Sequence, residues 1–137
     1  MSEKNIARVL YVEDEPDIQA VARVALEAVG GFEVQIYNSG NDAMDHLDEI
    51  KSFNPDVILL DVMMPGMDGP STLEALRKES HFVGTPVIFM TAKVQPHEVA
   101  DFKAMGALDV IPKPFDPMSL SQSIKTILAD RIEMAAG

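Results

Sequence analysis

Four apolar stretches of this sequence are each followed by polar side chains suited to phosphoryl or metal chemistry. Glu13-Asp14-Glu15 follows the first stretch, and Asp61, Thr91 and Lys113 follow the other three. If these stretches are parallel strands of one open sheet, their carboxyl ends form a single edge, where ligands bind in such sheets. The sequence therefore predicts a site that combines two or three carboxylates, a hydroxyl and an ammonium.

Each of these groups suits a task in phosphoryl transfer. Clustered carboxylates repel one another, so at least one should have a raised pKa unless a cation intervenes. An oxygen-only site fits a hard divalent ion such as Mg²⁺, and Glu13, Asp14 and Asp61 are its candidate ligands. Asp61 can also attack phosphorus as a nucleophile, while the Lys113 ammonium and the Thr91 hydroxyl can position the phosphoryl oxygens.

Each residue alone also has a structural explanation. The acidic residues before Pro16 could cap a helix, Asp61 could be a loop residue, and Thr91 could be a β-branched strand end. One polar group at each of these strand ends is harder to explain structurally, which favours a functional site.

The elements that must position these groups alternate in type. Short β-branched runs are separated by longer segments of helical spacing, which indicates βαβ units and a parallel sheet covered on both faces. Three of the runs are apolar throughout, as in interior strands, whereas the second alternates with polar residues, as in an edge strand. The predicted strands are Arg8–Val12, Phe32–Tyr37, Val57–Leu60, Pro86–Met90 and Leu108–Ile111.

Proline and glycine mark the predicted helix ends. Gly30-Gly31 and Gly106 fit helix termini that need a left-handed residue, Ser39 and Asp42 resemble a capping box, and Asp116 is a natural cap. Proline suits the first helical position because no N–H donor is needed there, and four prolines are expected at such positions: Pro16, Pro70, Pro96 and Pro117.

Composition limits the class of protein. The 137 residues fit one domain, with a core over about residues 8–130 and short tails. The absence of cysteine excludes disulfides, thiolate metal sites and thiol nucleophiles. No apolar run reaches membrane-spanning length, so a cytoplasmic protein without membrane insertion is expected. The net charge of −11 disfavours direct nucleic-acid binding.

Longer motifs resemble the receiver domain of two-component response regulators, from about Arg8 to Asp130. The pattern Asp-x-x-Met-Pro-x-x-Asp-Gly, which starts at Asp61, is highly specific, and three shorter motifs accompany it. The resemblance implies a single doubly wound, flavodoxin-like (βα)5 domain of the α/β class, with a five-stranded parallel sheet in the order 2-1-3-4-5. The shorter motifs are Tyr11-Val-Glu-Asp-Glu-Pro16, Met90-Thr-Ala92 and Pro112-Lys-Pro-Phe115.

The resemblance also implies roles for single residues. Asp61 is expected to accept a phosphoryl group from a phosphohistidine on a histidine kinase or a histidine phosphotransfer protein. Thr91 is expected to turn inward and bond to that group, and Lys113 to pair with it. The Lys113–Pro114 peptide is expected to be cis, as in similar domains.

A metal site is implied by the same likeness. Asp14 is expected to be a direct Mg²⁺ ligand, Glu13 to act through water, and the backbone carbonyl of Met63 to be a further ligand beside Asp61. Mn²⁺ is the alternative ion.

Four positions bear on switching and dephosphorylation. Where similar domains often carry an aromatic residue that moves with the threonine, this chain has Val110. Phe102 could substitute for it, although a core role is the alternative. Met63 and Lys93 lie at positions that, in similar domains, flank the path of the attacking water, so two bulky side chains there predict a hindered approach.

The first helix is more apolar than one buried face requires. One stripe is assigned to core packing, and the second is either a docking surface for the phosphodonor, as in similar receivers, or part of a deeply buried helix. The packing stripe is Ile18, Val21, Ala25 and Val29, and the second stripe is Ala20, Val24 and Ala28.

The expected function is a phosphorylation-controlled switch whose output is a contact with an unknown target protein. It is not an enzyme, apart from self-phosphorylation and hydrolysis of its own aspartyl phosphate. A phosphorylation-dependent homodimer through the fourth helix, fifth strand and fifth helix is left open. The alternative is a pseudo-receiver that binds a partner constitutively. A phosphatase with an aspartyl nucleophile would need a second aspartate at the position of Met63. In a flavodoxin-like cofactor carrier, Glu13-Asp14-Glu15 would repel the flavin phosphate.

Overall fold

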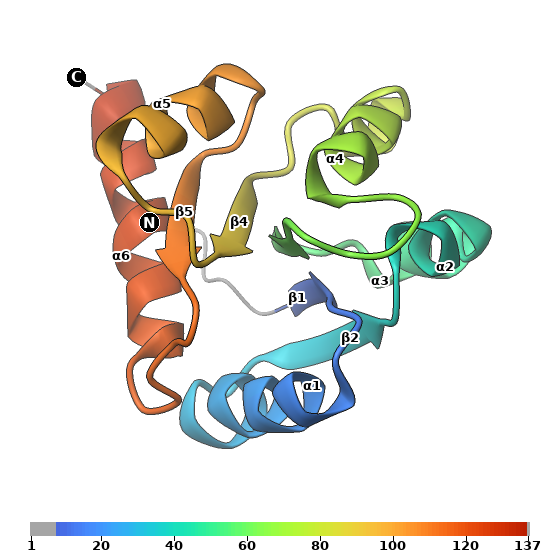
Figure 1. Cartoon of the computed structure of the whole chain (residues 1–137), viewed down its shortest axis with the longest axis horizontal. Coiled ribbons are helices and arrows are strands. Elements are labelled where there is room, and N and C mark those ends of the chain that lie inside the picture. The colour runs from blue at the N-terminus through green and yellow to red at the C-terminus, as the bar shows by residue number, and fades with distance from the viewer. Residues whose placement is uncertain (1–7, 137) are drawn as a thin grey trace.

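Five parallel strands form one sheet in the order β2-β1-β3-β4-β5 (Figure 1), which confirms the expected fold class and topology. The computed structural model describes residues 8–136, and the side chains of residues 8–131. The N-terminal tail lies outside the described residues. The strands are β1 (Arg8–Val12), β2 (Glu33–Tyr37), β3 (Val57–Asp61), β4 (Val87–Thr91) and β5 (Asp109–Pro112).

Helices cover both faces of the sheet (Figure 1). On one face lie α1 (Pro16–Arg23), its continuation as the π-helix η1 (Val24–Val29), and α6 (Leu120–Ala136). The other face carries α2 (Gly40–Asp45), α3 (Leu47–Phe53), α4 (Gly69–Arg77), the 3₁₀ turn η2 (Ser80–Phe82) and α5 (Pro96–Ala104). No helix in the described part of the chain has the length and apolar character that crossing a membrane requires.

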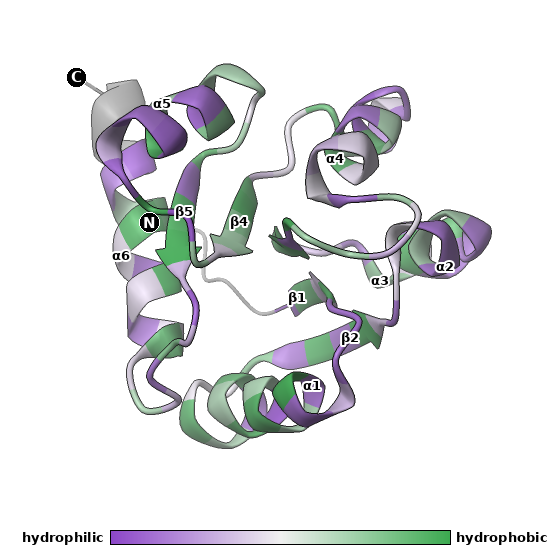
Figure 2. Cartoon of the chain, in the orientation of Figure 1, coloured by the Kyte–Doolittle hydropathy of each residue, from purple (hydrophilic) through white to green (hydrophobic). Residues whose placement is uncertain are grey.

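Two apolar clusters, one on each face, hold the helices to the sheet. In Figure 2 the inner strands are coloured largely green, the colour of hydrophobic residues. Consecutive strand residues point to opposite faces, so Leu10 and Val12 join the cluster under α2–α5, whereas Val9 and Tyr11 join the cluster under α1 and α6. All four residues are completely buried. The prediction of interior strands buried on both faces is therefore confirmed.

The predicted helix starts are confirmed at Pro16 and Pro96, and Pro70 lies one residue inside α4. The prediction for Pro117 is wrong, because α6 begins at Leu120. The Oδ1 atom of Asp116 accepts a hydrogen bond from the Met118 N–H at 2.9 Å. The Leu120 N–H also donates to the Asp116 carbonyl at 3.0 Å, so Asp116 caps a turn that leads directly into the helix, and its predicted capping role is confirmed. At its other end α6 extends to Ala136, into the predicted tail.

The predicted second helix is divided at His46, whose φ of −119° and ψ of 30° are not helical. Ser39 caps α2 by accepting from the Asp42 N–H at 2.9 Å, as expected. The Oδ2 atom of Asp42, however, accepts from the Asn38 N–H, so the capping box is only half formed. Gly31 and Gly106 adopt positive φ at helix ends, as predicted.

The stripe assigned to core packing on the first helix is wrong in part. Ala25 is buried as expected, but its buried neighbours are Ala22 and Leu26, whereas Val21 and Val29 are each 43% exposed. Both candidate stripes are apolar, so sequence periodicity could not choose between them. The π-helical turns of η1 also change the angular spacing of side chains from the α-helical period that the prediction assumed.

Candidate functional site

The strand register brings the predicted site residues to one edge of the sheet. Val12 pairs with Leu60, which places Glu13 and Asp14 beside Asp61 at the carboxyl end of β3. In the β4–β5 pair, Thr91 lies opposite Pro112, and Lys113 follows immediately. Parallel pairing therefore brings together residues that are up to 100 positions apart in the chain.

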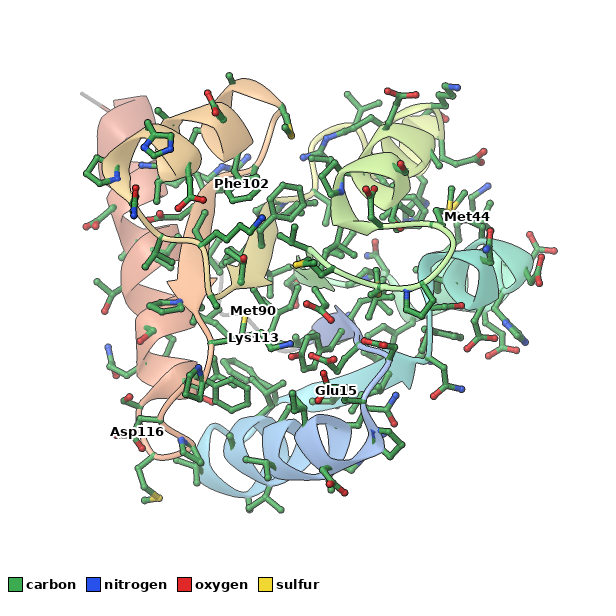
Figure 3. The ribbon with its side chains drawn as sticks, viewed as in Figure 1. Glu15, Met44, Met90, Phe102, Lys113 and Asp116 are labelled. Carbon is green, nitrogen blue, oxygen red and sulfur yellow. The ribbon has the colours of Figure 1, made fainter. Side chains whose placement is uncertain are left out.

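Lys113 joins two of the carboxylates. Its Nζ lies 3.1 Å from Oε1 of Glu13 and 3.3 Å from Oδ1 of Asp61. Glu13 is completely buried, Asp61 is 3% exposed, and the Lys113 side chain is 17% exposed. In Figure 3 the labelled Lys113 extends toward the carboxylates near Glu15. Because this ion pair is largely shielded from water, its charges interact more strongly than a surface pair would.

Glu13 is held by three donors of the protein. The Tyr11 hydroxyl donates to Oε1 at 2.9 Å, Lys113 donates to the same oxygen, and the Glu15 N–H donates to Oε2 at 3.2 Å. The side-chain amide of Gln19 fixes the same loop by donating to the Glu13 carbonyl at 2.6 Å and to Oδ1 of Asn38 at 2.9 Å. Glu13 is thus a fixed anion with one acceptor position left, on Oε2.

Asp14 differs from Glu13 because part of its carboxylate has no partner. Its Oδ1 atom is buried, and it makes no hydrogen bond within the described part of the chain. A buried carboxylate oxygen without a partner is unfavourable unless a cation or water meets it. Ligand atoms of Glu13, Asp14 and Glu15 also lie within 4.8 Å of one another. The donors are all oxygens, so the site fits a hard divalent cation such as Mg²⁺.

The acidic surroundings shift two pKa values. Burial, together with the negative charge of Glu13, raises the pKa of Asp61 to about 7, although Lys113 opposes the change. Burial lowers the pKa of Lys113, but its hydrogen bond to Glu13 and the charges of Glu13 and Asp61 outweigh burial and raise it overall. The predicted raised pKa in the carboxylate cluster is therefore confirmed, and Asp61 carries it.

Thr91 is present at the edge but bonds elsewhere in this structure. It is 4% exposed, and its Oγ1 accepts a hydrogen bond from the Lys93 N–H at 3.0 Å. As an acceptor in that bond, the hydroxyl keeps its own proton available for donation. The role expected for Thr91, a bond to the phosphoryl group, stays a prediction.

The loop after Asp61 approaches the strand closely. A Cβ added at Gly69 would lie 2.7 Å from the Asp61 carbonyl oxygen and 2.8 Å from the Val62 Cα, so only glycine fits there. The Gly69 N–H donates to the Val62 carbonyl at 2.9 Å, which closes the loop. Met63 lies within this loop and is 68% exposed. Its proposed carbonyl contact with a metal stays a prediction.

The sequence left two roles open for Phe102, as a substitute for the aromatic residue that Val110 replaces or as a core residue. Phe102 on α5 is 8% exposed and packs edge-on against Phe89, with ring centroids 5.2 Å apart. It therefore has the core role, which Figure 3 shows by its inward direction. Val110 itself is partly buried against the same cluster.

A pocket of ≈ 230 Å³ lies next to the site, between α1 and the segment after β5. Apolar side chains predominate in its lining, which includes Ile18, Val21 and Phe115. The second apolar stripe of the first helix is exposed, with Val24 at 59%, so the deeply buried alternative is wrong. The Lys113–Pro114 peptide beside this pocket is cis, as predicted.

Tyr11 and Gln19 are functional candidates that the sequence analysis missed. Tyr11 gave a signal, because a hydroxyl in an otherwise aliphatic buried strand must find a polar partner. Gln19 gave none, since a glutamine near the start of a helix is common. Both were found only from their contacts with Glu13.

Comparisons with known proteins agree with this geometry. A family model described as the response regulator receiver domain matches residues 9–125. The curated relatives include the regulatory protein AtoC of Escherichia coli, 37% identical over 90% of this chain and 25% of AtoC. They also include the response regulator Rre1 of Synechocystis, 32% identical over 88% of this chain and 51% of Rre1. The chain spans about half or less of the length of these relatives.

Solved structures give the same result. Chemotaxis response regulator CheY4 of Vibrio cholerae superposes with a TM-score of 0.80 at 30% identity, covering 90% of this chain and 99% of that one. The receiver domain of Francisella response regulator 1452 gives a TM-score of 0.71 at 26% identity, covering 91% and 98%. From the shared topology, the acidic edge of the sheet and the match over residues 9–125, this chain belongs to the response regulator receiver domain family of two-component systems.

Proposed function

We propose that this chain is a phosphorylation-controlled switch that accepts a phosphoryl group on Asp61. The donor is a phosphohistidine of a histidine kinase or a histidine phosphotransfer protein. The observation that carries the proposal is the buried cluster in which one ammonium, that of Lys113, lies 3.3 Å from the Asp61 carboxylate while Asp14 presents an unpartnered oxygen.

In the proposed step, an oxygen of Asp61 attacks the phosphorus of the phosphohistidine. A P–O bond forms, the P–N bond breaks, and its electron pair returns to the imidazole nitrogen, which then takes a proton. Asp61 must be ionised to attack, and in the metal-free protein its pKa is about 7, even with Lys113 beside it. Lys113 neutralises charge on the transferred group from its position beside Oδ1, and the Thr91 hydroxyl donates to a phosphoryl oxygen.

The family binds Mg²⁺ at an acidic pocket, and we assign that role here to Asp14, Asp61 and the Met63 carbonyl. Glu13, whose Oε2 retains one free acceptor position, acts through water, as the family resemblance implies. When bound, Mg²⁺ supplies positive charge that keeps Asp61 ionised and balances the phosphoryl oxygens. Mn²⁺ fits the same oxygen ligands.

The proposed partners follow from the surface. The exposed stripe that includes Val24, with the adjoining pocket at Ile18 and Phe115, suits docking of an apolar surface on the phosphodonor.

The output is a contact with a target protein, and hydrolysis of the aspartyl phosphate ends the signal. The bulky side chains of Met63 and Lys93, both exposed beside the site, slow that hydrolysis. We place the chain in the cytoplasm, where response regulators generally act.

Several relatives are named as transcriptional or DNA-binding regulators. The match covers about half of each of those proteins, and this chain carries a net charge of −11. We therefore propose that the receiver segment itself does not contact nucleic acid. Phosphorylation-dependent dimerisation through α5, β5 and α6 stays a second form of output.

Phosphorylation by acetyl phosphate in the presence of Mg²⁺, measured by intact mass and by release with hydroxylamine, tests the proposal. Wild type should gain one alkali-labile and hydroxylamine-sensitive phosphoryl group, and Asp61→Asn should gain none. Asp101→Asn, an exposed change on α5, is the matched control and should be labelled like wild type. If wild type is not labelled by acetyl phosphate or by a phosphohistidine donor, the constitutive pseudo-receiver becomes the better interpretation.

A further inference from the structure

Tyr11 is an unusual residue for the interior strand that it occupies. It lies in β1 between the neighbouring strands β2 and β3, and none of its surface is exposed. A phenylalanine would fill the same space without bringing a polar atom into the core. The hydroxyl satisfies its hydrogen-bonding need through one oxygen, Oε1 of Glu13, at 2.9 Å.

The same oxygen also accepts from Lys113, so the phenol and the ammonium share it. Lys113 in turn divides its donors between Glu13 at 3.1 Å and Asp61 at 3.3 Å. A carboxylate oxygen that already accepts one hydrogen bond attracts a second donor less strongly. The Tyr11 hydroxyl therefore weakens the hold of Glu13 on Lys113 and leaves the ammonium available to Asp61.

We propose that Tyr11 is a positioning residue, whose hydroxyl fixes Glu13 and keeps the Lys113 ammonium shared between Glu13 and Asp61. The effect on phosphoryl transfer rests on the proposed function, but the effect on the contacts among Glu13, Asp61 and Lys113 does not. Glu13 is well suited to this arrangement, because its second methylene gives the reach that brings Oε1 to the phenol of a residue two positions earlier in the strand.

Removal of the hydroxyl by Tyr11→Phe should move Lys113 toward Glu13 and away from Asp61. Two measurable changes follow, with opposite signs. Mg²⁺ should bind more tightly, because Asp61 loses a competing cation, and phosphorylation by acetyl phosphate should become slower, because Lys113 no longer meets the transferred group. Each change should be about ten-fold, as expected for one hydrogen bond to a charged group.

The test is a double-mutant cycle in the full chain with Tyr11→Phe, Glu13→Asp and the double variant. MgCl₂ titrations followed by amide NMR shifts give the metal affinity, and intact mass gives the phosphorylation rate, both at about pH 8. In the Glu13→Asp background the shorter carboxylate cannot hold the phenol in the same way, so Tyr11→Phe should change neither quantity. Tyr37→Phe is the control, since its hydroxyl bonds to Gln35 and Glu49 away from the site.

A structural role alone would lower the stability of Tyr11→Phe but leave the Mg²⁺ affinity and the phosphorylation rate of the folded protein unchanged, and that result overturns the proposal. An equal effect of Tyr11→Phe in the wild-type and Glu13→Asp backgrounds overturns it as well. If wild type is never phosphorylated but the Mg²⁺ affinities follow the predicted cycle, the proposed function fails and the positioning role stands. If wild type is phosphorylated normally but Tyr11→Phe changes neither quantity in either background, the proposed function stands and the positioning role fails.

Discussion

The raised pKa of Asp61 predicts that Asp61→Asn stabilises the metal-free protein at alkaline pH. Burial and the charge of Glu13 raise this pKa from 3.8 to about 7, so the folded protein retains a proton that the unfolded chain has already released. The stability of wild type therefore falls as the pH rises from about 4 to about 7. The asparagine variant has no carboxylate at this position and escapes the loss.

The size of the effect follows from the shift of about three pKa units. At about 1.4 kcal/mol for each unit, keeping Asp61 charged in the folded protein costs at most about 4 kcal/mol. The variant also loses the charged partner of Lys113, although Lys113 keeps its bond to Glu13. A net gain of about 1–3 kcal/mol in the free energy of unfolding above about pH 8 is therefore expected, with little gain near pH 5.

Urea unfolding followed by circular dichroism, with EDTA present at about pH 5.5 and about pH 8.5, measures this difference. Asp101→Asn is the control, because that side chain is exposed on α5. Two results would refute the reasoning: a variant less stable than wild type at the higher pH, or a gain of the same size at both values. Either would mean that the negative charge of Asp61 is not the source of the instability.

Three further predictions rest on separate parts of the structure. Mg²⁺ at about a hundred times its dissociation constant should raise the free energy of unfolding of wild type by about 2.7 kcal/mol in urea. Asp14→Asn should lose most of this gain because the unpartnered oxygen is a proposed ligand, and an undiminished gain would remove Asp14 from the site. Val24→Glu should slow transfer from a phosphohistidine donor without changing labelling by acetyl phosphate, and equal slowing with both donors would reject docking at α1. Because Val24 is 59% exposed, the free energy of unfolding of the Val24→Glu variant should differ from that of wild type by less than about 0.5 kcal/mol. Gly30→Ala should destabilise the fold by about 1–3 kcal/mol in urea, since the added Cβ overpacks the contact with α6. That Cβ would clash with the Ser121 hydroxyl and lie 2.8 Å from the Leu26 carbonyl oxygen. Gly84→Ala, which meets nothing within 4 Å, should change little, and similar losses in both variants would contradict the packing argument.

The sequence predicted the architecture well where the signal was local and repeated. Continuous apolar runs identified the buried strands, and polar residues at their ends identified Glu13, Asp61 and Lys113 as neighbours. Helix boundaries were less reliable at Pro117, because a side-chain bond from Asp116 formed a turn where a helix start was expected. The packing face of the first helix was also misassigned, since two apolar stripes compete and η1 departs from the α-helical period.

Local sequence patterns were sufficient to predict the order of strands and helices and the types of groups at one sheet edge, because strand alternation, proline and glycine act over a few residues. How those groups share their hydrogen bonds could be seen only in the folded protein. The division of Lys113 between Glu13 and Asp61, the link from Tyr11, and the unpartnered oxygen of Asp14 depend on distances between strands. Such distances are set by packing of the whole sheet, and no local pattern of residues encodes them.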